Sequence, residues 1–294
     1  MTQRSNKQRK TDKEMNRWPN PWITILTASF NGAKTIEHTI QSIRSQSIQN
    51  IQHIVVDGGS TDGTLKILRS YKDSYNLFWI SEPDEGIADA LNKGLRFAMG
   101  EYLLVLQTDD YLLSQDSLEK AWEAIQKCRA DFHIFPAILD HPQKTPKLLT
   151  PFPFLWWNHF KFIFCHQGCF VNRRIFENIG GYRKEFAITF DYDFFYRALN
   201  AHCTVKFENF PIALMGATGI SSNPSYLYER LREEYRVQKM NEEKLFWGMA
   251  QYIFRAFYIP YKRWITNYHD GSSNELKTWR KHRTQESDQR RKQL

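Results

Sequence analysis

Residues 22–107 alternate between short apolar segments of strand length and segments whose apolar residues recur every three or four positions, as on one face of a helix. Strands that alternate with helices at this spacing form a mostly parallel sheet with helices on both faces. The predicted strands are residues 22–28, 52–57, 77–80 and 102–107, and the predicted helices are residues 35–46, 64–71 and 87–99. The sequence therefore predicts an α/β fold, whose ligands bind beyond the carboxyl ends of the strands.

Polar side chains follow the predicted strands at the points where they end. The first strand runs into residues 27–31, the second ends at Asp57, the third is followed by residues 82–84, and the fourth is followed by Asp109 and Asp110. Converging carboxylates repel one another unless a cation binds among them. An isolated Asp-Asp pair is most often a solvated turn, but in this company Asp109 and Asp110 form the oxygen site expected for Mg²⁺ or Mn²⁺ bound to a diphosphate.

The net charge of +8 lies at the two ends of the 294-residue chain. Residues 1–17 hold six Lys or Arg against two acids, and residues 262–294 hold nine against four. These ends together carry +9, which leaves about −1 for the residues between them. A near-neutral body is no basic surface for nucleic acid, so we expect no nucleic-acid partner. The basic ends suit an anionic membrane face or serve solubility alone.

The cysteines and the N-terminal residues bear on the cellular compartment. The four cysteines form no CxxC pair, and the sequence lacks the paired ligands of a zinc site. The basic stretch within residues 1–17 is followed by no apolar core, so we expect no signal peptide. These observations predict reduced thiols in a cytoplasmic protein.

Five segments form a pattern that is more specific than any one of them. They are TILTASFN (24–31), VVDGGSTDGT (55–64), SEPDEGIADALNKGLRFAMGEYLLVLQTDD (81–110), HQGCFVNRRIFENIGGY (166–182) and FDYDFFYR (190–197). In this order and at this spacing they resemble the family 2 glycosyltransferases over roughly residues 20–215. The resemblance implies the GT-A fold, a Rossmann-like α/β architecture that binds a nucleotide-sugar donor.

The resemblance implies a donor site at the carboxyl edge of the sheet. The residues expected to bind the donor are Thr27, Ser29, Asn31, Asp57, Asp84, Lys93 and Asp109. Asp57 would accept a hydrogen bond from the nucleotide base, most often uracil. Asp110, with Asp109, would hold Mn²⁺ or Mg²⁺, and Asp109 would also lie toward the ribose or the sugar. Lys93 would neutralise phosphate, although a lysine on a helix surface is more often merely solvated.

An inverting transfer needs a base that takes the proton from the acceptor hydroxyl. In the family this base is the Asp of an ED motif, and the register of the motif aligns Asp191 with it. Asp193 is the rival carboxylate on the acceptor side, expected to point away from the anomeric carbon. His166 and Gln167 resemble the family's segment that lines the acceptor side, although His166 could also be a buried structural histidine.

The family pattern ends near residue 220, where the chain changes character. We expect a basic disordered tail (1–19), the GT-A domain (20–220), a helical aromatic-rich appendage (221–265) and a second basic tail (266–294). Residues 245–261 combine Trp, Tyr and Phe with flanking basic residues and are too short and interrupted to span a membrane. Two interpretations fit them equally. One is a helix that lies in an anionic membrane interface, at the inner face of the plasma membrane, and the other is a helix that packs on the catalytic domain.

The resemblance implies an inverting hexosyl- or N-acetylhexosaminyltransferase that acts in cell-surface polysaccharide synthesis. It would move a sugar from a nucleotide-diphosphate donor, most often a UDP-sugar, to a hydroxyl of a glycan or lipid-linked acceptor. The alternative is a catalytically inactive nucleotide-sugar binding or scaffolding protein, because Phe190 stands where the family has its Glu. The presence of Asp109, Asp110 and Asp191 favours the enzyme.

Overall fold

The computed structural model describes residues 20–141, 144–216 and 224–269. Within them the central sheet has seven strands. These are β1 (Ile23–Ser29), β2 (Ile51–Asp57), β3 (Leu77–Ser81), β4 (Tyr102–Val105), β6 (Phe132–Ile134), β9 (Cys169–Asn172) and β10 (Val205–Phe207). The four predicted strands are confirmed within a residue or two at each end. The predicted tail at 1–19 and residues 270–294 of the second tail lie outside the described residues.

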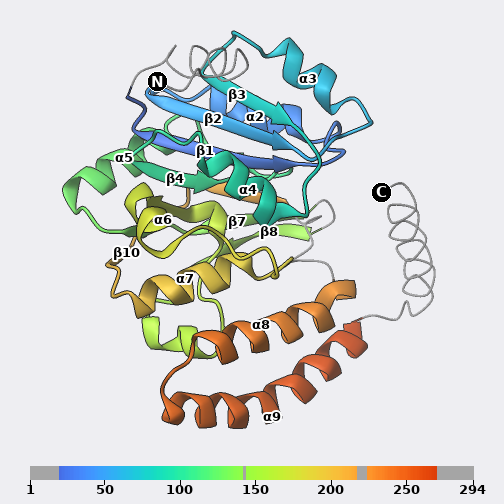
Figure 1. Ribbon diagram of the computed structural model, residues 1–294, viewed down its shortest axis with the longest axis vertical. Coiled ribbons are helices and arrows are strands. Elements are labelled where there is room, and N and C mark those ends of the chain that lie inside the picture. The colour runs from blue at the N-terminus through green and yellow to red at the C-terminus, as the bar shows by residue number, and fades with distance from the viewer. Residues whose placement is uncertain (1–19, 142–143, 217–223, 270–294) are drawn as a thin grey trace, which may run out of the picture.

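The strand order of the central sheet is β10-β6-β9-β4-β1-β2-β3. β9 runs antiparallel to β4 and to β6, while β1 is parallel to β2 and β4, β2 to β3, and β6 to β10. The carboxyl ends of β1, β2, β3 and β4 therefore meet at one edge of the sheet (Figure 1). The mostly parallel sheet expected from the sequence is confirmed.

Helices cover both faces of this sheet, as Figure 1 shows. They are α2 (Ile36–Arg44), α3 (Thr64–Ser70), α4 (Ile87–Leu95), α5 (Ser117–Lys127), α6 (Arg173–Ile179) and α7 (Phe190–Asn200). Successive side chains of a strand point to opposite faces, so β1 contributes to two cores. Ile23 and Ile25 pack with α2, α3 and α5, whereas Leu26 and Ala28 pack with α4, α6 and α7.

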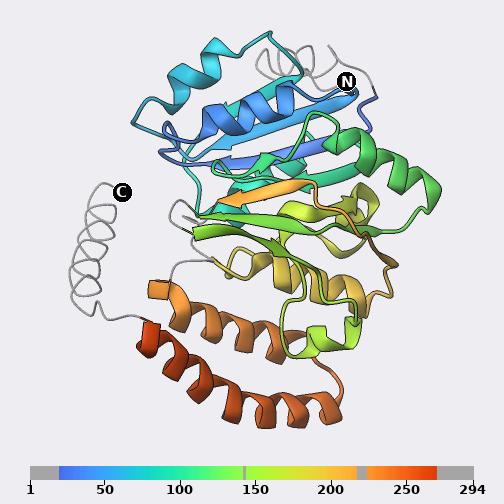
Figure 2. The ribbon, with the colours of Figure 1, turned by 180° about the vertical axis from the view of Figure 1, so that it is seen from behind.

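A second, smaller sheet lies beside the carboxyl end of β4 (Figure 2). Its strands are β5 (Tyr111–Leu112), β7 (Ala137–His141), β8 (Lys144–Leu149) and β11 (Ala213–Gly216), in the order β5-β11-β7-β8. The sequence did not predict this sheet, because its strands are short and pair with strands far away in the chain. Leu112 of β5, for example, pairs with Ala213 of β11. The pairing brings β11 next to the residues that follow β4.

A helical layer closes the molecule beyond α7. It consists of the 3-10 turn η1 (Leu155–His159), α8 (Leu227–Asn241) and α9 (Leu245–His269), and α8 lies between α7 and α9 in Figure 1. Trp247 stacks on His159 with ring centroids 4.2 Å apart, and the buried Gln251 Nε2 lies 3.4 Å from the hydroxyl of Tyr196. One face of α9 therefore packs on η1 and α7. Among the described residues, no helix combines the length and hydrophobicity that a transmembrane segment requires.

Candidate functional site

A cavity of about 650 Å³ opens beyond the carboxyl ends of β1 and β4. Its lining includes the loops after these strands, the start of α4, the 3-10 turn η2 (His166–Gly168), the first turn of α7 and the end of β11. The predicted site residues in this lining are Ser29, Asn31, Asp84, Asp109, Asp110, His166, Gln167 and Asp191. A second cavity, of about 700 Å³, lies along α5, and none of the predicted site residues lines it. The convergence of these residues makes the first cavity the candidate site.

Asp110 is almost fully buried at the wall of this cavity. Its Oδ2 accepts hydrogen bonds from the amide of Gln107 (2.9 Å) and from Nε2 of Gln167 (3.1 Å), and its Oδ1 accepts one from the amide of Gly216 (3.2 Å). Burial raises the pKa of Asp110, and the charge of the neighbouring Asp109 adds to the rise. A Cβ atom at Gly216 would stand 2.5 Å from Asp109 Oδ2, so glycine at this position leaves room for the Asp109 carboxylate.

Asp109 and Asp110 fit a divalent cation that takes further ligands from elsewhere. Among the described residues, no group of three or more His, Cys, Asp or Glu side chains is placed to hold a metal ion. Mg²⁺ typically binds through one or two carboxylates and completes its shell with substrate phosphates and water. Two adjacent carboxylates at a cavity wall match that ligand set. The site therefore suits an ion that binds together with a diphosphate.

Asp191, in the first turn of α7, meets His166 of η2 at the cavity wall. Its Oδ2 lies 3.2 Å from His166 Nδ1, and its Oδ1 accepts a hydrogen bond of 2.8 Å from the amide of Tyr192. Burial lowers the pKa of His166, but the hydrogen bond to Asp191 and the charges of Asp191, Asp110 and Asp109 outweigh it, and the net shift is upward from 6.5. The Asp191 side chain stays partly exposed, so a hydroxyl group in the cavity can reach its carboxylate.

Asp193 lies on the opposite side of α7, because two residues correspond to about 200° around a helix. It is fully buried. Its Oδ1 accepts hydrogen bonds from Arg183 (3.0 Å) and Asn241 (2.9 Å), and its Oδ2 accepts one from Arg197 (2.9 Å). The sequence assigned Asp193 to the acceptor side, whereas the structure places its carboxylate in the contact between α7 and α8, away from the cavity lining.

The end of β1 and the loop after it hold two of the predicted donor residues, Ser29 and Asn31. Asn31 has a left-handed backbone (φ 51°), and its Oδ1 accepts a hydrogen bond of 2.9 Å from the amide of Thr61. Ser29 Oγ, Gln167 Oε1 and His166 Nε2 are buried and have no hydrogen-bond partner within the described residues. Leaving a buried polar atom without a partner costs free energy. These atoms therefore mark places where the polar groups of a ligand can bind.

Asp57 ends β2 as the sequence predicted, but it lies below the cavity lining. It is fully buried and accepts hydrogen bonds from the amides of Gly59 (3.1 Å) and Ser60 (2.9 Å) and from the hydroxyls of Ser60 and Ser81. Asp57 thus closes the turn that follows β2. Because Asp57 is fully buried, a nucleotide base can contact it only if this turn moves.

Thr27 and Lys93 also lie away from the cavity lining. Thr27 Oγ1 is 3.0 Å from Nε2 of His53 in the core, where burial lowers the pKa of His53 to about 3. Lys93 Nζ forms ion pairs with Glu82 (3.2 Å) and Asp89 (3.3 Å). Lys93 therefore holds the turn after β3 in place, next to Asp84, whose pKa is raised by burial.

Glu233 of α8 is a residue that the sequence analysis missed. Its carboxylate accepts hydrogen bonds from the amides of Ala187 (3.0 Å), Ile188 (2.9 Å) and Thr189 (3.0 Å) and from the hydroxyl of Thr189 (3.2 Å). Ala187 and Ile188 line the cavity, and Asp191 follows two residues after this loop. Glu233 therefore fixes the wall that leads into the first turn of α7. No local motif marks it, because its partners are more than forty residues away in the chain.

The chain is similar to known glycosyltransferases. The model for "Glycosyl transferase family 2" matches residues 24–180. An uncharacterized glycosyltransferase of Mycobacterium tuberculosis is 30% identical over 217 residues, which cover 72% of this chain and 82% of the relative. TuaG of Bacillus subtilis, a putative teichuronic acid biosynthesis glycosyltransferase, is 37% identical over 112 residues, which cover 37% of this chain and 43% of TuaG.

The solved structures share the fold. The crystal structure of S. aureus TarS 1-349 in complex with UDP-GlcNAc aligns with a TM-score of 0.61 at 19% identity, over 76% of this chain and 67% of the TarS chain. At this identity the likeness concerns the fold alone. It confirms the GT-A-like architecture expected from the sequence.

Proposed function

Because this chain belongs to the family 2 glycosyltransferases, we propose that it moves a hexosyl or N-acetylhexosaminyl group, with inversion, from a UDP-sugar to a hydroxyl of a glycan or lipid-linked acceptor. The proposed setting is cell-surface polysaccharide synthesis on the cytoplasmic side of the plasma membrane. TuaG and the UDP-GlcNAc complex of TarS support the pathway and the donor. The observation that carries the proposal is that Asp191 and the Asp109-Asp110 pair line one cavity.

We assign the donor to the part of the cavity that the ends of β1, β3 and β4 line. Ser29 and Asn31 would contact the base and ribose, and Ser29 supports this role because its buried hydroxyl has no partner within the described residues. Asp84 would face the nucleotide from the turn after β3. Asp57 would bind the base after a movement of its own turn, which its burial requires.

We assign the diphosphate to Asp109 and Asp110. Mn²⁺ or Mg²⁺ bound there would act as a Lewis acid that neutralises the charge developing on the departing nucleotide diphosphate. The bonds from Gln107, Gln167 and Gly216 fix the orientation of the Asp110 carboxylate. Burial raises the pKa of Asp110 and so disfavours its charged form. A neighbouring cation would favour the charged carboxylate and would offset this effect of burial.

We assign the base to Asp191. As the acceptor oxygen bonds to the anomeric carbon and the bond to the nucleotide diphosphate breaks, the hydroxyl proton passes to the Asp191 carboxylate. His166 and the amide of Tyr192 hold this carboxylate from two sides, which orients it toward the cavity. Gln167 and His166 would line the acceptor side.

Hydrolysis of a panel of nucleotide sugars, with Mn²⁺, with Mg²⁺ and with chelator, tests this function without knowledge of the acceptor. We expect metal-dependent hydrolysis of one UDP-sugar above the others. Asp110→Ala and Asp109→Ala should abolish metal-dependent donor binding, because each removes an oxygen ligand. Glu123→Ala, which changes an exposed carboxylate on α5, is the matched control.

Two outcomes would contradict the assignment. Donor affinity that is the same with and without metal in the wild type, Asp109→Ala and Asp110→Ala would exclude the cation site. Tight, metal-dependent donor binding with no hydrolysis or transfer for any donor would instead support the inactive binding or scaffolding protein.

A further inference from the structure

The outer face of α9 exposes large apolar side chains at helical spacing. Its members are Leu245, Phe246, Met249, Tyr252, Ile253, Phe257 and Tyr261, which recur every three or four residues. Four of them are exposed by 70% or more, namely Leu245 (80%), Phe257 (76%), Tyr252 (74%) and Phe246 (70%). A contiguous apolar face of this kind marks an interaction surface in a folded protein.

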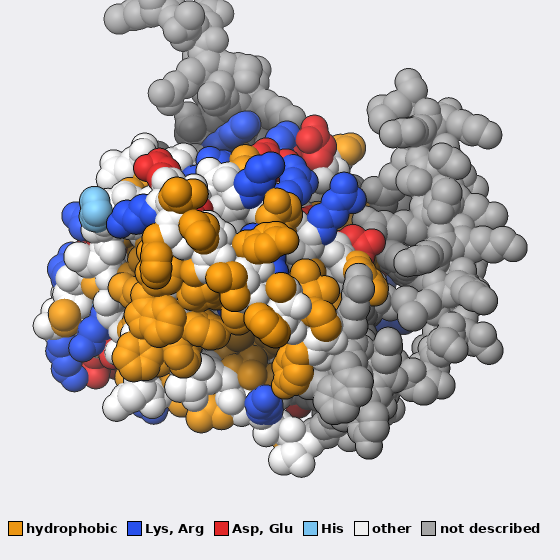
Figure 3. Space-filling view, turned by 90° about the horizontal axis from the view of Figure 1, so that it is seen from below, with side chains coloured by type: hydrophobic (Ala, Val, Ile, Leu, Met, Phe, Trp, Pro, Cys, Tyr) orange, Lys and Arg blue, Asp and Glu red, His pale blue; other side chains and the backbone are white. Residues whose placement is uncertain are grey.

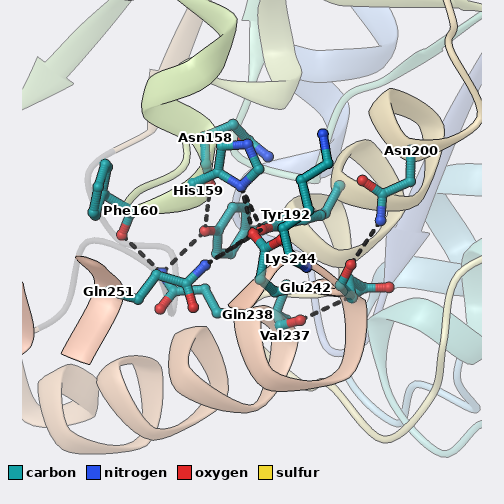
Figure 4. A network of polar contacts seen from close by, with 12 residues as sticks. Asn158, His159, Phe160, Tyr192, Asn200, Val237, Gln238, Glu242, Lys244 and Gln251 are labelled. Carbon is teal, nitrogen blue, oxygen red and sulfur yellow. Dashed lines mark hydrogen bonds and ion pairs between the residues drawn. The ribbon is translucent and has the colours of Figure 1, made fainter. Parts of the chain in front are cut away.

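The opposite face of α9 is held in place by a buried polar network (Figure 4). His159 Nδ1 and the hydroxyl of Tyr196 each lie 2.6 Å from Glu242 Oε2, and Gln251 Nε2 lies 3.3 Å from the same oxygen. Trp247 stacks on His159. Because this face is fixed by specific contacts, the orientation of α9 is determined, and its outer face points away from the protein.

The exposed face of α9 continues onto a segment almost a hundred residues earlier in the chain. Phe152, Phe154 and Trp156, before and within η1, are also exposed. Phe160 and Trp247 connect the two segments: the ring centroids of Trp156 and Phe160 are 6.3 Å apart, those of Phe160 and Trp247 are 5.7 Å apart, and Trp247 contacts Phe246. Figure 3 shows the resulting apolar area on the lower side of the molecule. We call these exposed residues of α9 together with Phe152, Phe154 and Trp156 the apolar surface.

The charges around the apolar surface have one sign along α9. Residues 245–269 contain no Asp or Glu, and Lys262 lies within them, while Lys244 and the exposed Glu243 precede them. Residues 262–294 then hold nine Lys or Arg against four acids. Each Lys or Arg near an anionic membrane contributes to binding, whereas acidic residues oppose it. This charge distribution complements an anionic lipid surface.

We propose that the apolar surface is a peripheral membrane-binding site, which inserts the aromatic side chains of α9 and of residues 152–156 into the interface of an anionic bilayer. Trp, Tyr and Phe favour the boundary between headgroups and acyl chains, and basic residues near such a helix add attraction to anionic headgroups. The helix lies in the plane of the interface and adds to the molecule a function that its cavity does not provide. This inference concerns a surface outside the cavity, so it stands independently of the proposed transfer reaction.

Vesicle flotation of the full chain tests the proposal. The probes are vesicles of phosphatidylcholine alone and of phosphatidylcholine mixed with phosphatidylglycerol in equal parts, without donor or acceptor. The wild type should bind the mixed vesicles, bind phosphatidylcholine more weakly, and lose affinity for the mixed vesicles as salt is raised. The triple variant Phe246→Gln, Tyr252→Gln, Phe257→Gln should lose about a hundredfold in partitioning, because it removes three interfacial rings.

The controls separate binding from folding. Leu113→Gln changes an exposed apolar side chain after β5 and should bind vesicles like the wild type. The triple variant should keep the unfolding midpoint and the donor hydrolysis rate of the wild type, because its three side chains project into solvent. Equal vesicle binding by the wild type and the triple variant would overturn the proposal. So would a wild type that binds no vesicles but sediments as a dimer that the triple variant dissociates, because the apolar surface would then join two copies of this chain.

Discussion

The two sides of α7 hold their carboxylates in opposite ways. On the side toward the cavity, Asp191 is partly exposed and is held by one backbone amide and His166. On the side toward α8, Asp193 is fully buried, and Arg183, Arg197 and Asn241 occupy both of its oxygens. A buried carboxylate between two arginines stabilises the fold, while one that is exposed to a cavity can be reached by a hydroxyl group and accept its proton. Access to the cavity and the absence of an arginine partner, and not residue type, therefore distinguish Asp191 from Asp193.

The largest expected effect is on turnover at Asp191. Asp191→Asn keeps the shape and most hydrogen bonding of the side chain but cannot take the acceptor's proton, so turnover should fall by roughly a hundredfold to ten-thousandfold. Donor affinity should barely change, because the donor residues lie at the ends of β1, β3 and β4 and not on α7. Transfer rates and calorimetric donor binding measure the two effects. Normal turnover in this variant would mean that the base has been misassigned.

Asp193→Asn tests the structural role of the buried carboxylate on α7. Removing the charge leaves Arg183 and Arg197 without their shared carboxylate, and breaking a buried ion pair typically costs about 3 kcal/mol or more of unfolding free energy. Turnover per folded molecule should change much less than in Asp191→Asn. Denaturant unfolding and transfer rates, measured on the same preparation, test both statements. A variant with wild-type stability and no turnover would move Asp193 into the reaction.

Asp57→Asn tests whether a fully bonded carboxylate can still bind a ligand. If Asp57 binds the base, affinity for UDP should fall by about tenfold or more, because hydrogen bonds to charged groups contribute about 1.5–3 kcal/mol. Calorimetry with UDP measures the loss, and Asp62→Asn, in the exposed loop nearby, is the control. If UDP affinity is retained while the unfolding midpoint falls, Asp57 only closes the turn after β2.

The smallest expected effect concerns Glu233, which joins α8 to the cavity wall. Glu233→Gln leaves fewer acceptors for the amides of Ala187, Ile188 and Thr189, so the first turn of α7 loses part of its support. We expect turnover to fall by about tenfold with donor KM nearly unchanged, because misplacing a catalytic group lowers the rate more than the binding. Glu229→Gln, exposed on the same helix, should behave like the wild type. An equal loss of turnover in both variants would show that Glu233 does not position the first turn of α7.

Local patterns predicted the strands β1 to β4 of the central sheet and the part of the cavity that follows them. Apolar runs in the sequence predict the strands β1 to β4. Because these strands are parallel, their carboxyl ends lie at one edge of the sheet. The strand prediction alone therefore brings Ser29, Asp84 and the Asp109-Asp110 pair together. The family resemblance added Asp191, which the fold places in the same cavity.

Only the tertiary structure decided which polar residues line the cavity and which pair with partners elsewhere in the fold. Thr27 pairs with His53, and Lys93 pairs with Glu82 and Asp89. Asp193 pairs with Arg183, Arg197 and Asn241. Thr27, Lys93 and Asp193 therefore lie away from the cavity lining. The second sheet and the support from Glu233 also depend on contacts between distant segments. Periodicity reports which face of an element is buried, but hydrogen bonds are short and directional, so their partners are fixed only when those distant segments have packed together.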